Sequence, residues 1–181
     1  LNWSVDFDAI EKIYASGLKV HALCSPHNPL GRIYSREELS KFAQLAKKYG
    51  VVVISDEIHG PLALSEHEFV PFLSVSPEAA EVGICVTSAS KAFNIAGLKS
   101  ALIVSQSAQM HELLAKMPMS VHYRSSILGA FAAVEAFNKG DEWLAGAIST
   151  IESNAHYLKA LLDTQLPAAK YEIPKCSYLA W

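Results

Sequence analysis

The chain has 181 residues, of which 51% are hydrophobic and 18% are charged, and its formal net charge is −3. This composition excludes a disordered chain and a charged interaction tail, and the length allows one domain or one and a fraction. The slight negative charge gives no broad cationic surface for nucleic acid or anionic lipid, and no apolar run approaches the roughly 20 residues that cross a bilayer. We therefore expect neither a nucleic-acid partner nor a membrane span.

The two ends of the sequence and its cysteines bear on origin and location. The chain starts at Leu1 without a Met and shows no charged segment followed by an apolar one, as a secretory signal would. It stops at Trp181 inside the alternating apolar stretch 177–181, so we expect a fragment of a longer protein. The cysteines, Cys24, Cys85 and Cys176, are odd in number and widely spaced, which favours reduced thiols in a cytoplasmic protein over a disulfide framework.

Helical patterns and short apolar runs alternate from about residue 6 to residue 105. This alternation predicts an α/β fold with a mostly parallel sheet. A capping box at residues 35–38 marks the start of one helix, and Gly50 marks its end. Besides this helix we expect one at residues 6–15, a short one starting near Ser76, and strands at residues 20–24, 51–54, 82–86 and 101–104.

After residue 106 the pattern becomes helical. We expect helices at residues 107–117, 125–138 and 141 to about 162, followed by strand-like stretches at 171–173 and 178–181. The second half of the long helix is predicted to bridge two units. Residues 1–145 would then form part of a large domain, and residues 146–181 the bridging helix and the start of a smaller C-terminal domain.

Polar residues follow three of the predicted strands. Asn28 lies in the loop after the first strand, Asp56 and His59 follow the second, and Ser88-Ala89-Ser90-Lys91 follows the third. In an open α/β sheet, ligands bind beyond the carboxyl ends of the strands. An amide, a carboxylate and an amine at neighbouring strand ends predict a site of mixed charge at this edge.

Each of these residues also has a structural interpretation. Asp56 alone is as typical of a structural residue, a helix cap or a turn, as of a functional one. Asn28 between two prolines is typical of an Asx turn, and Glu57 is typical of a solvated or structural carboxylate. Lys91 alone is more typical of a surface charge. Its apolar neighbours instead favour a lysine held among apolar groups, as Schiff-base chemistry requires; they are Ala89, Ala92, Phe93, Ile95 and Ala96. The cysteines and histidines show no repeated pair at metal-ligand spacing, so we expect no metal site.

A helicase-type ATPase is a remote alternative. Residues 52–59 match the apolar strand and Asp-Glu-x-His pattern of those enzymes, and Thr87-Ser88-Ala89 resembles their downstream Ser-Ala-Thr segment. Such enzymes also need a Gly-x-x-x-x-Gly-Lys-Ser/Thr phosphate loop, and this sequence contains none. The only arginines, Arg32, Arg36 and Arg124, form no arginine-rich motif, which further weighs against a nucleic-acid motor.

Three ordered motifs resemble those of a known family. They are Asn28-Pro29-x-Gly31-Arg32, Ser55-Asp56-Glu57-Ile58-His59, and the segment from Ser88 to Lys99, which includes Ser90-Lys91-x-Phe93-Asn94-x-Ala96-Gly97-Leu98. In order and spacing they resemble the fold-type I pyridoxal-phosphate enzymes of the class I/II aminotransferase group. The residues of the second and third motifs are most similar to those of the MalY/PatB-type cystathionine β-lyases. The similarity runs through almost the whole chain, including residues 140–144 and 177–181.

The resemblance implies the fold of the pyridoxal-phosphate-dependent transferases, with a three-layer, mostly parallel sheet in the large domain and a smaller α+β C-terminal domain. It also implies a role for each polar residue. Lys91 would be the Schiff-base lysine that moves the α-proton, Asp56 would pair with the pyridine nitrogen, and Asn28 would donate to the phenolic oxygen of the cofactor. His59, where many relatives carry Tyr, would approach the same oxygen or stack nearby. The phosphate would be bound by Ser88 and Lys99, with Ser90 a weaker candidate.

The implied reaction is α,β-elimination of a cysteine S-conjugate such as cystathionine to pyruvate, ammonia and a thiol. An aminotransferase of the same fold is the near alternative, because transamination begins with the same proton abstraction. Family members are homodimers, so we expect a dimer of the intact protein. The aromatic ring that stacks on the cofactor, the phosphate loop and the arginine for the substrate carboxylate are expected outside this chain.

Overall fold

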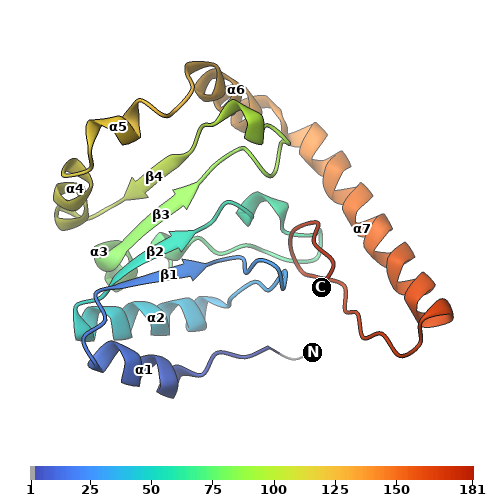
Figure 1. The fold of residues 1–181 in the computed structure, drawn as a ribbon, viewed down its shortest axis with the longest axis horizontal. Helices are drawn as coiled ribbons and strands as arrows, with labels where there is room; N and C mark the ends of the chain where they lie inside the picture. The colour runs from blue at the N-terminus through green and yellow to red at the C-terminus, as the bar shows by residue number, and fades with distance from the viewer. Residues whose placement is uncertain (1–2) are drawn as a thin grey trace.

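The computed structural model describes residues 3–181 (Figure 1). The strands are β1 (Val20–Cys24), β2 (Val52–Asp56), β3 (Gly83–Thr87) and β4 (Leu102–Ser105). The helices are α1 (Phe7–Ala15), α2 (Arg36–Tyr49), α3 (Pro77–Val82), α4 (Ala108–Ala115), α5 (Met119–His122), α6 (Ile127–Lys139) and α7 (Asp141–Gln165). Three short 3₁₀ turns join them, η1 (Gly60–Leu62), η2 (Phe72–Ser74) and η3 (Ala96–Leu98). Every predicted helix is present with small shifts at its ends, and α5 is an additional one.

The four strands form one sheet in the order β1-β2-β3-β4. The first two pairs are parallel, and β4 runs antiparallel to β3. The prediction of an α/β fold with a mostly parallel sheet is therefore confirmed. Cys24 pairs with Asp56, and Asp56 pairs with Val86, so the carboxyl ends of the three parallel strands lie together. Figure 1 shows their arrowheads at the edge of the sheet that faces α7.

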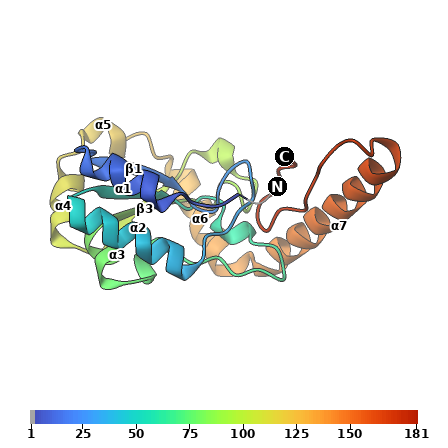
Figure 2. The same ribbon diagram turned by 90° about the horizontal axis from the view of Figure 1, so that it is seen from below.

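Helices α2 and α3 cover one face of the sheet, as Figure 2 shows from below. The capping box begins α2, because the Ser35 hydroxyl accepts from the Glu38 N–H while the Glu38 carboxylate accepts from the Ser35 N–H. Gly50, with φ of 67°, ends the helix in the left-handed conformation. The apolar side of α2 then packs on inward side chains of β1 and β2 in the main core; the buried residues include Leu39, Phe42, Ala46, Leu23 and Val53.

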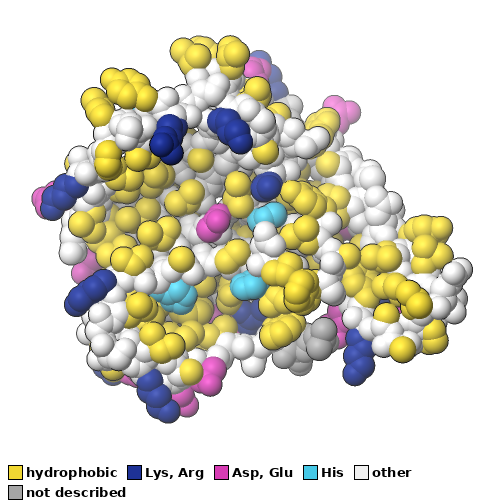
Figure 3. All heavy atoms as spheres, in the orientation of Figure 1, with side chains coloured by type: hydrophobic (Ala, Val, Ile, Leu, Met, Phe, Trp, Pro, Cys, Tyr) yellow, Lys and Arg dark blue, Asp and Glu magenta, His cyan; other side chains and the backbone are white. Residues whose placement is uncertain are grey.

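The opposite face of the sheet is largely open over the residues that the structure describes. In β4 the side chains of Leu102, Ile103 and Val104 are 49%, 42% and 43% exposed, although consecutive strand residues point to opposite faces. Figure 3 shows that this open face is mostly hydrophobic, with a small group of charged and histidine side chains near its centre.

The C-terminal part of the chain leads away from the sheet along α7 and then returns to it (Figure 1). The returning segment is held by hydrogen bonds from Lys175 N–H to Gly31 O and from Ser177 N–H to Leu62 O, both 3.0 Å long. The predicted strands at residues 171–173 and 178–181 are wrong. This stretch is irregular apart from a single bridge between Ala63 and Cys176, because it packs on loops rather than beside a strand.

None of the helices in residues 3–181 combines the length and apolar character needed to cross a membrane. Within the same residues, no three or more His, Cys, Asp or Glu side chains gather as metal ligands would.

Candidate functional site

Asp56 lies at the carboxyl end of β2, the middle strand of the parallel part of the sheet. Alternation along β2 buries Val53 and Ser55 against the helices and turns Asp56 to the open face, where it is exposed. Its Oδ1 also accepts from the Ile58 N–H at 3.2 Å, so the residue shapes the turn that follows the strand. The turn interpretation is thus correct, and it leaves the carboxylate accessible to a ligand.

Lys91 lies in the tight turn that follows β3. The turn is closed by hydrogen bonds from Phe93 N–H to Ala89 O at 3.0 Å and from Ile95 N–H to Ser90 O at 3.1 Å. Ala89 and Ala92 are buried, and Ala92 belongs to a small apolar cluster with Leu62 and Cys176. Lys91 itself is partly buried, and Ala96, further along, is exposed.

His59 lies three residues after Asp56, at the start of η1. The side chain is buried at 5% exposure, and its Nδ1 lies 3.0 Å from the hydroxyl of Ser177. Burial lowers the pKa of His59 most, the positive charge of Lys91 lowers it further, and the negative charge of Asp56 raises it. Both charges therefore act on the imidazole, in opposite directions.

Ser88, Ser90 and Lys99 line one hollow on the open face, with Val86 and Ile103 among its apolar lining. The hydroxyl of Ser88 donates to Ser100 O at 2.6 Å and accepts from the Ser90 N–H at 3.0 Å, and the two hydroxyl oxygens are 2.7 Å apart. Lys99 is exposed at the end of η3, where its backbone is left-handed with φ of 54°. Hydroxyls and a cation around one hollow suit an anionic group such as a phosphate.

Arg124 and Ser125 line the same hollow, and sequence reasoning missed them. They precede α6, far along the chain from Ser88. A hydrogen bond from Ser126 N–H to Lys99 O, 3.0 Å long, brings this segment to the hollow. The polar run just before a predicted helix was visible in the sequence, but nothing local indicated that it folds back over the sheet.

Asn28 lies at the same edge of the sheet, in the loop after β1. Its side chain is exposed, and its N–H donates to the sulfur of Cys24 at 3.3 Å. Cys24 pairs with Asp56 in the sheet, so this loop adjoins the end of β2. Asn28 is not among the residues that line the hollow of Ser88.

Glu57 points into the core rather than to the site. Its carboxylate accepts from the Ser55 hydroxyl at 2.9 Å, the Phe72 N–H at 2.8 Å and the Cys85 thiol at 3.2 Å. Burial raises the pKa of Glu57, partly offset by these hydrogen bonds. The structural interpretation of Glu57 is therefore the one that the structure supports.

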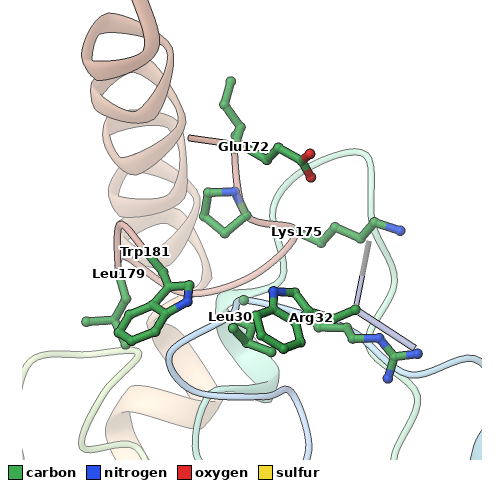
Figure 4. Close-up of a pocket in the computed structure, with 10 residues that line it drawn as sticks. Leu30, Arg32, Glu172, Lys175, Leu179 and Trp181 are labelled. Carbon is green, nitrogen blue, oxygen red and sulfur yellow. The ribbon is translucent and has the colours of Figure 1, made fainter. Parts of the chain in front are cut away.

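A second pocket lies between the loop after β1 and the C-terminal segment. Figure 4 shows Leu179 and Trp181 on its α7 side and Arg32 and Lys175 on the opposite side. The guanidinium of Arg32 pairs with Glu38 and lies 4.5 Å from the centre of the Tyr34 ring, so it is already engaged. No predicted site residue lines this pocket.

The polar residues that follow the strands occur along the chain in the order typical of a known family. Residues 1–178 match the aminotransferase class I and II family, so the chain belongs to that family. Because the match includes the Asp-Glu-Ile-His segment, the helicase-type alternative loses its support.

Individual relatives show which members of this family the chain resembles. The chain is 39% identical over 186 residues to cystathionine beta-lyase PatB of Bacillus subtilis, a match that covers 99% of this chain and 47% of PatB. The PLP-bound C-S lyase from Staphylococcus hominis is a similar solved structure, with a TM-score of 0.90 and 34% identity over 99% of this chain and 45% of that one. Nicotianamine aminotransferase B of Hordeum vulgare is 39% identical over 69 residues, which are 38% of this chain and 12% of that protein. The chain thus spans about half the length of the cystathionine beta-lyases that it matches.

Proposed function

We propose that the protein is a pyridoxal-phosphate-dependent carbon–sulfur β-lyase that acts on cystathionine or a similar cysteine S-conjugate. The observation that carries the proposal is a hollow lined by hydroxyls and cations at the carboxyl ends of the strands, where Asp56 pairs with Val86 of its lining and Lys91 follows Ser90. Similarity to proteins named cystathionine beta-lyase and to a solved PLP-bound C-S lyase supports it.

The residues on the open face fit the three polar groups of pyridoxal phosphate. The hollow of Ser88, Ser90 and Lys99, with Arg124, suits the phosphate. The exposed carboxylate of Asp56 suits a protonated ring nitrogen, and the amine of Lys91 suits the aldehyde carbon. Asn28 and His59 would serve the phenolic oxygen from the neighbouring loop and turn.

When bound, the cofactor supplies an electron sink for the α-carbon of the amino-acid substrate. Lys91 would take the α-proton and later return a proton, as a general base and acid. Asp56 would keep the ring nitrogen protonated, because a nearby negative charge favours the charged form. His59 is held neutral by its burial and by Lys91, so it would act through hydrogen bonds. Loss of the β-thiolate and hydrolysis would give a thiol, pyruvate and ammonia.

Covalent attachment of the cofactor tests this assignment. Full-length protein loaded with pyridoxal phosphate is reduced with borohydride, which fixes the cofactor to the lysine that holds it. Mass spectrometry of the peptides should find the cofactor on Lys91, and Lys91→Ala should remove both the label and the near-visible absorbance band. Lys12→Ala, an exposed lysine on α1, is the matched control. A label that persists in Lys91→Ala contradicts the proposal.

The aminotransferase alternative is supported by the similarity to nicotianamine aminotransferase B. Cystathionine supplied without any keto acid separates the two. A β-lyase releases pyruvate and a free thiol under these conditions, whereas an aminotransferase turns over only when a keto acid acceptor is added. Turnover that depends on the acceptor would therefore overturn the lyase assignment.

We further propose that the full-length protein is a cytoplasmic homodimer with two domains, divided near residue 145. The free thiols of Cys24, Cys85 and Cys176 agree with a reducing compartment. The exposed apolar residues of α6, among them Ile127, Leu128 and Phe131, suit an interface with a second copy. The course of α7 away from the sheet in Figure 1 supports the domain division.

A further inference from the structure

The C-terminal segment contacts the candidate site through His59. The hydroxyl of Ser177 lies 3.0 Å from Nδ1 of His59, and the thiol of Cys176 donates to the carbonyl oxygen of His59 at 3.1 Å. The ring of Tyr178 meets the imidazole edge-on, with 6.1 Å between ring centres. Three consecutive residues thus contact one histidine that lies more than a hundred positions earlier in the chain.

Ser177 is itself held in one place. Its N–H donates to Leu62 O at 3.0 Å, and the residue is 3% exposed. Its backbone is left-handed, with φ of 73°, which costs free energy for any residue other than glycine. Glycine would adopt this backbone without that cost, so a serine here indicates that the side chain is used.

The bond to Ser177 determines which nitrogen of His59 is available. The two ring nitrogens diverge, and the hydrogen bond made by one of them sets the tautomer and the role of the other. Nδ1 is occupied by Ser177, which leaves Nε2 for a bound group. His59 lies three residues after Asp56, in the turn that follows the carboxyl end of β2, so Nε2 belongs to a histidine at the candidate site.

We propose that Ser177 is a positioning residue, whose hydroxyl holds the His59 imidazole in one orientation and one tautomer so that Nε2 is presented to the group bound between Asp56 and Lys91. The identity of that group, the cofactor with its amino-acid substrate, rests on the proposed function. The bond between Ser177 and His59 does not. Ser177 acts through the histidine and need not touch the substrate.

The test uses two variants of the full-length protein, Ser177→Ala and Ser177→Gly. Both remove the hydroxyl, but only glycine also relieves the left-handed backbone, so a change shared by both comes from the hydroxyl. The ¹⁵N shifts of the His59 ring are measured without cofactor in histidine-labelled protein, and His59→Gln assigns the signals. Ser153→Ala removes a hydroxyl from α7 that bonds only locally to Ser149 O, and it serves as the matched control.

The wild-type protein and Ser153→Ala should show one neutral tautomer of His59, and both Ser177 variants should shift toward a mixture of the two. In the loaded enzyme, both variants should lower kcat/KM about tenfold, the lower end of the loss found when hydrogen-bond partners of metal-ligating histidines are removed, and should change its pH profile. Unchanged His59 shifts in both variants would overturn the proposal. Failure of the wild-type protein to bind pyridoxal phosphate would instead contradict the proposed function and would leave the histidine spectra as predicted.

Discussion

Among single residues, His59 is the one whose pKa is shifted in opposite directions by two charged residues of the site, Lys91 and Asp56. Burial and Lys91 lower its pKa, and Asp56 raises it. The neutral form is therefore favoured at neutral pH, in which one ring nitrogen donates a hydrogen bond and the other accepts one. The pKa of this histidine depends on the charges of both Lys91 and Asp56. Its titration can therefore test whether the two residues lie near it, without any ligand.

We predict that two substitutions move the pKa of His59 in opposite directions. Lys91→Ala removes a positive charge that disfavours the imidazolium, so the pKa should rise; Asp56→Asn removes a negative charge that favours it, so the pKa should fall. NMR titration of the cofactor-free protein measures both, with Lys12→Ala as the control. Shifts of the same sign in the two variants would mean that the three side chains are not grouped as described.

Glu57 provides a second prediction, about the pH dependence of stability. Its folded pKa is raised above the usual 4.5, so the folded protein keeps this proton to higher pH than the unfolded chain does. The contribution of the protonated group is complete below pH 4.5 and is lost as the pH rises through the folded pKa. Glu57→Gln cannot ionise, so its free energy of unfolding relative to wild type should increase with pH over this window.

Urea unfolding at several pH values measures this effect, and Glu68→Gln on the exposed loop is the control. A constant difference between wild type and Glu57→Gln across the window would contradict the prediction. Glu57→Ala should lower the free energy of unfolding by about 2 to 4 kcal/mol at low pH, because it leaves the buried Phe72 N–H without its acceptor and opens a cavity, and this loss should shrink as the pH rises through the same window.

Sequence reasoning found the residues of the site that follow strands, because a buried strand ending in a polar group is a local signal. Asp56 and Lys91 are of this kind. Arg124 and Ser177 belong to segments that long-range hydrogen bonds bring to the site, from Ser126 N–H to Lys99 O in the one case and between Ser177 and His59 in the other. No spacing in the sequence records such contacts, so neither residue was predicted to lie there.

At the scale of elements, side-chain caps explain why the helices were predictable. Asp6, Ser35, Ser76, Ser107 and Ser126 each accept a hydrogen bond from the N–H three positions later and so begin a helix. The strand-like C-terminal stretch lacked such a signal. Its alternation arises because Pro174 and Cys176 are buried against loops while Lys175 and Tyr178 are exposed, and a strand also needs a neighbour to pair with.

The packing of this stretch on the loop after β1 leads to a prediction for Gly31. A Cβ at this position would meet Pro174 Cβ and would lie 2.7 Å from Cys176 O, and the backbone is left-handed with φ of 60°. Gly50 has a similar φ of 67° but open space around it. Gly50→Ala should cost about 1 kcal/mol of unfolding free energy, and Gly31→Ala about 2 to 4 kcal/mol.

Chemical denaturation of the two variants gives the comparison directly, because the backbone cost is shared and the steric cost is not. We also expect Gly31→Ala, but not Gly50→Ala, to alter the His59 spectrum, since the clash displaces the segment that carries Ser177. Equal costs at the two glycines would mean that the C-terminal segment does not pack on this loop.

At the scale of the whole molecule, the sheet is covered on one side and bare on the other. The class of fold was predictable from the alternation of helices and strands. The antiparallel direction of β4 was not, because it depends on how the Lys91 turn and η3 return the chain to the sheet. The exposed residues of β4 and α6 were also not foreseen individually, since their apolar character alone indicated burial.

We predict that the 181-residue chain by itself binds a hydrophobic dye and self-associates, because many large apolar side chains of β4 and α6 are exposed. Phe131→Glu places a charge on a side chain that is 65% exposed on α6, and it should reduce both effects. Light scattering and dye fluorescence measure them, and Ala132→Glu on the less exposed side of α6 is a control for charge alone. A dispersed, dye-free monomer of the wild-type chain would refute the prediction.

The hydrogen bond between His59 and Ser177 closes a loop of 118 positions. Contacts this distant in sequence form late, because much of the chain must first be ordered between them. During synthesis β2, which ends at Asp56, and β3, which precedes the Lys91 turn, can pair as soon as they emerge, but His59 gains its partner only after residue 177 has left the ribosome. The charged groups of the site are therefore in place early, and the orientation of the histidine between them is completed last.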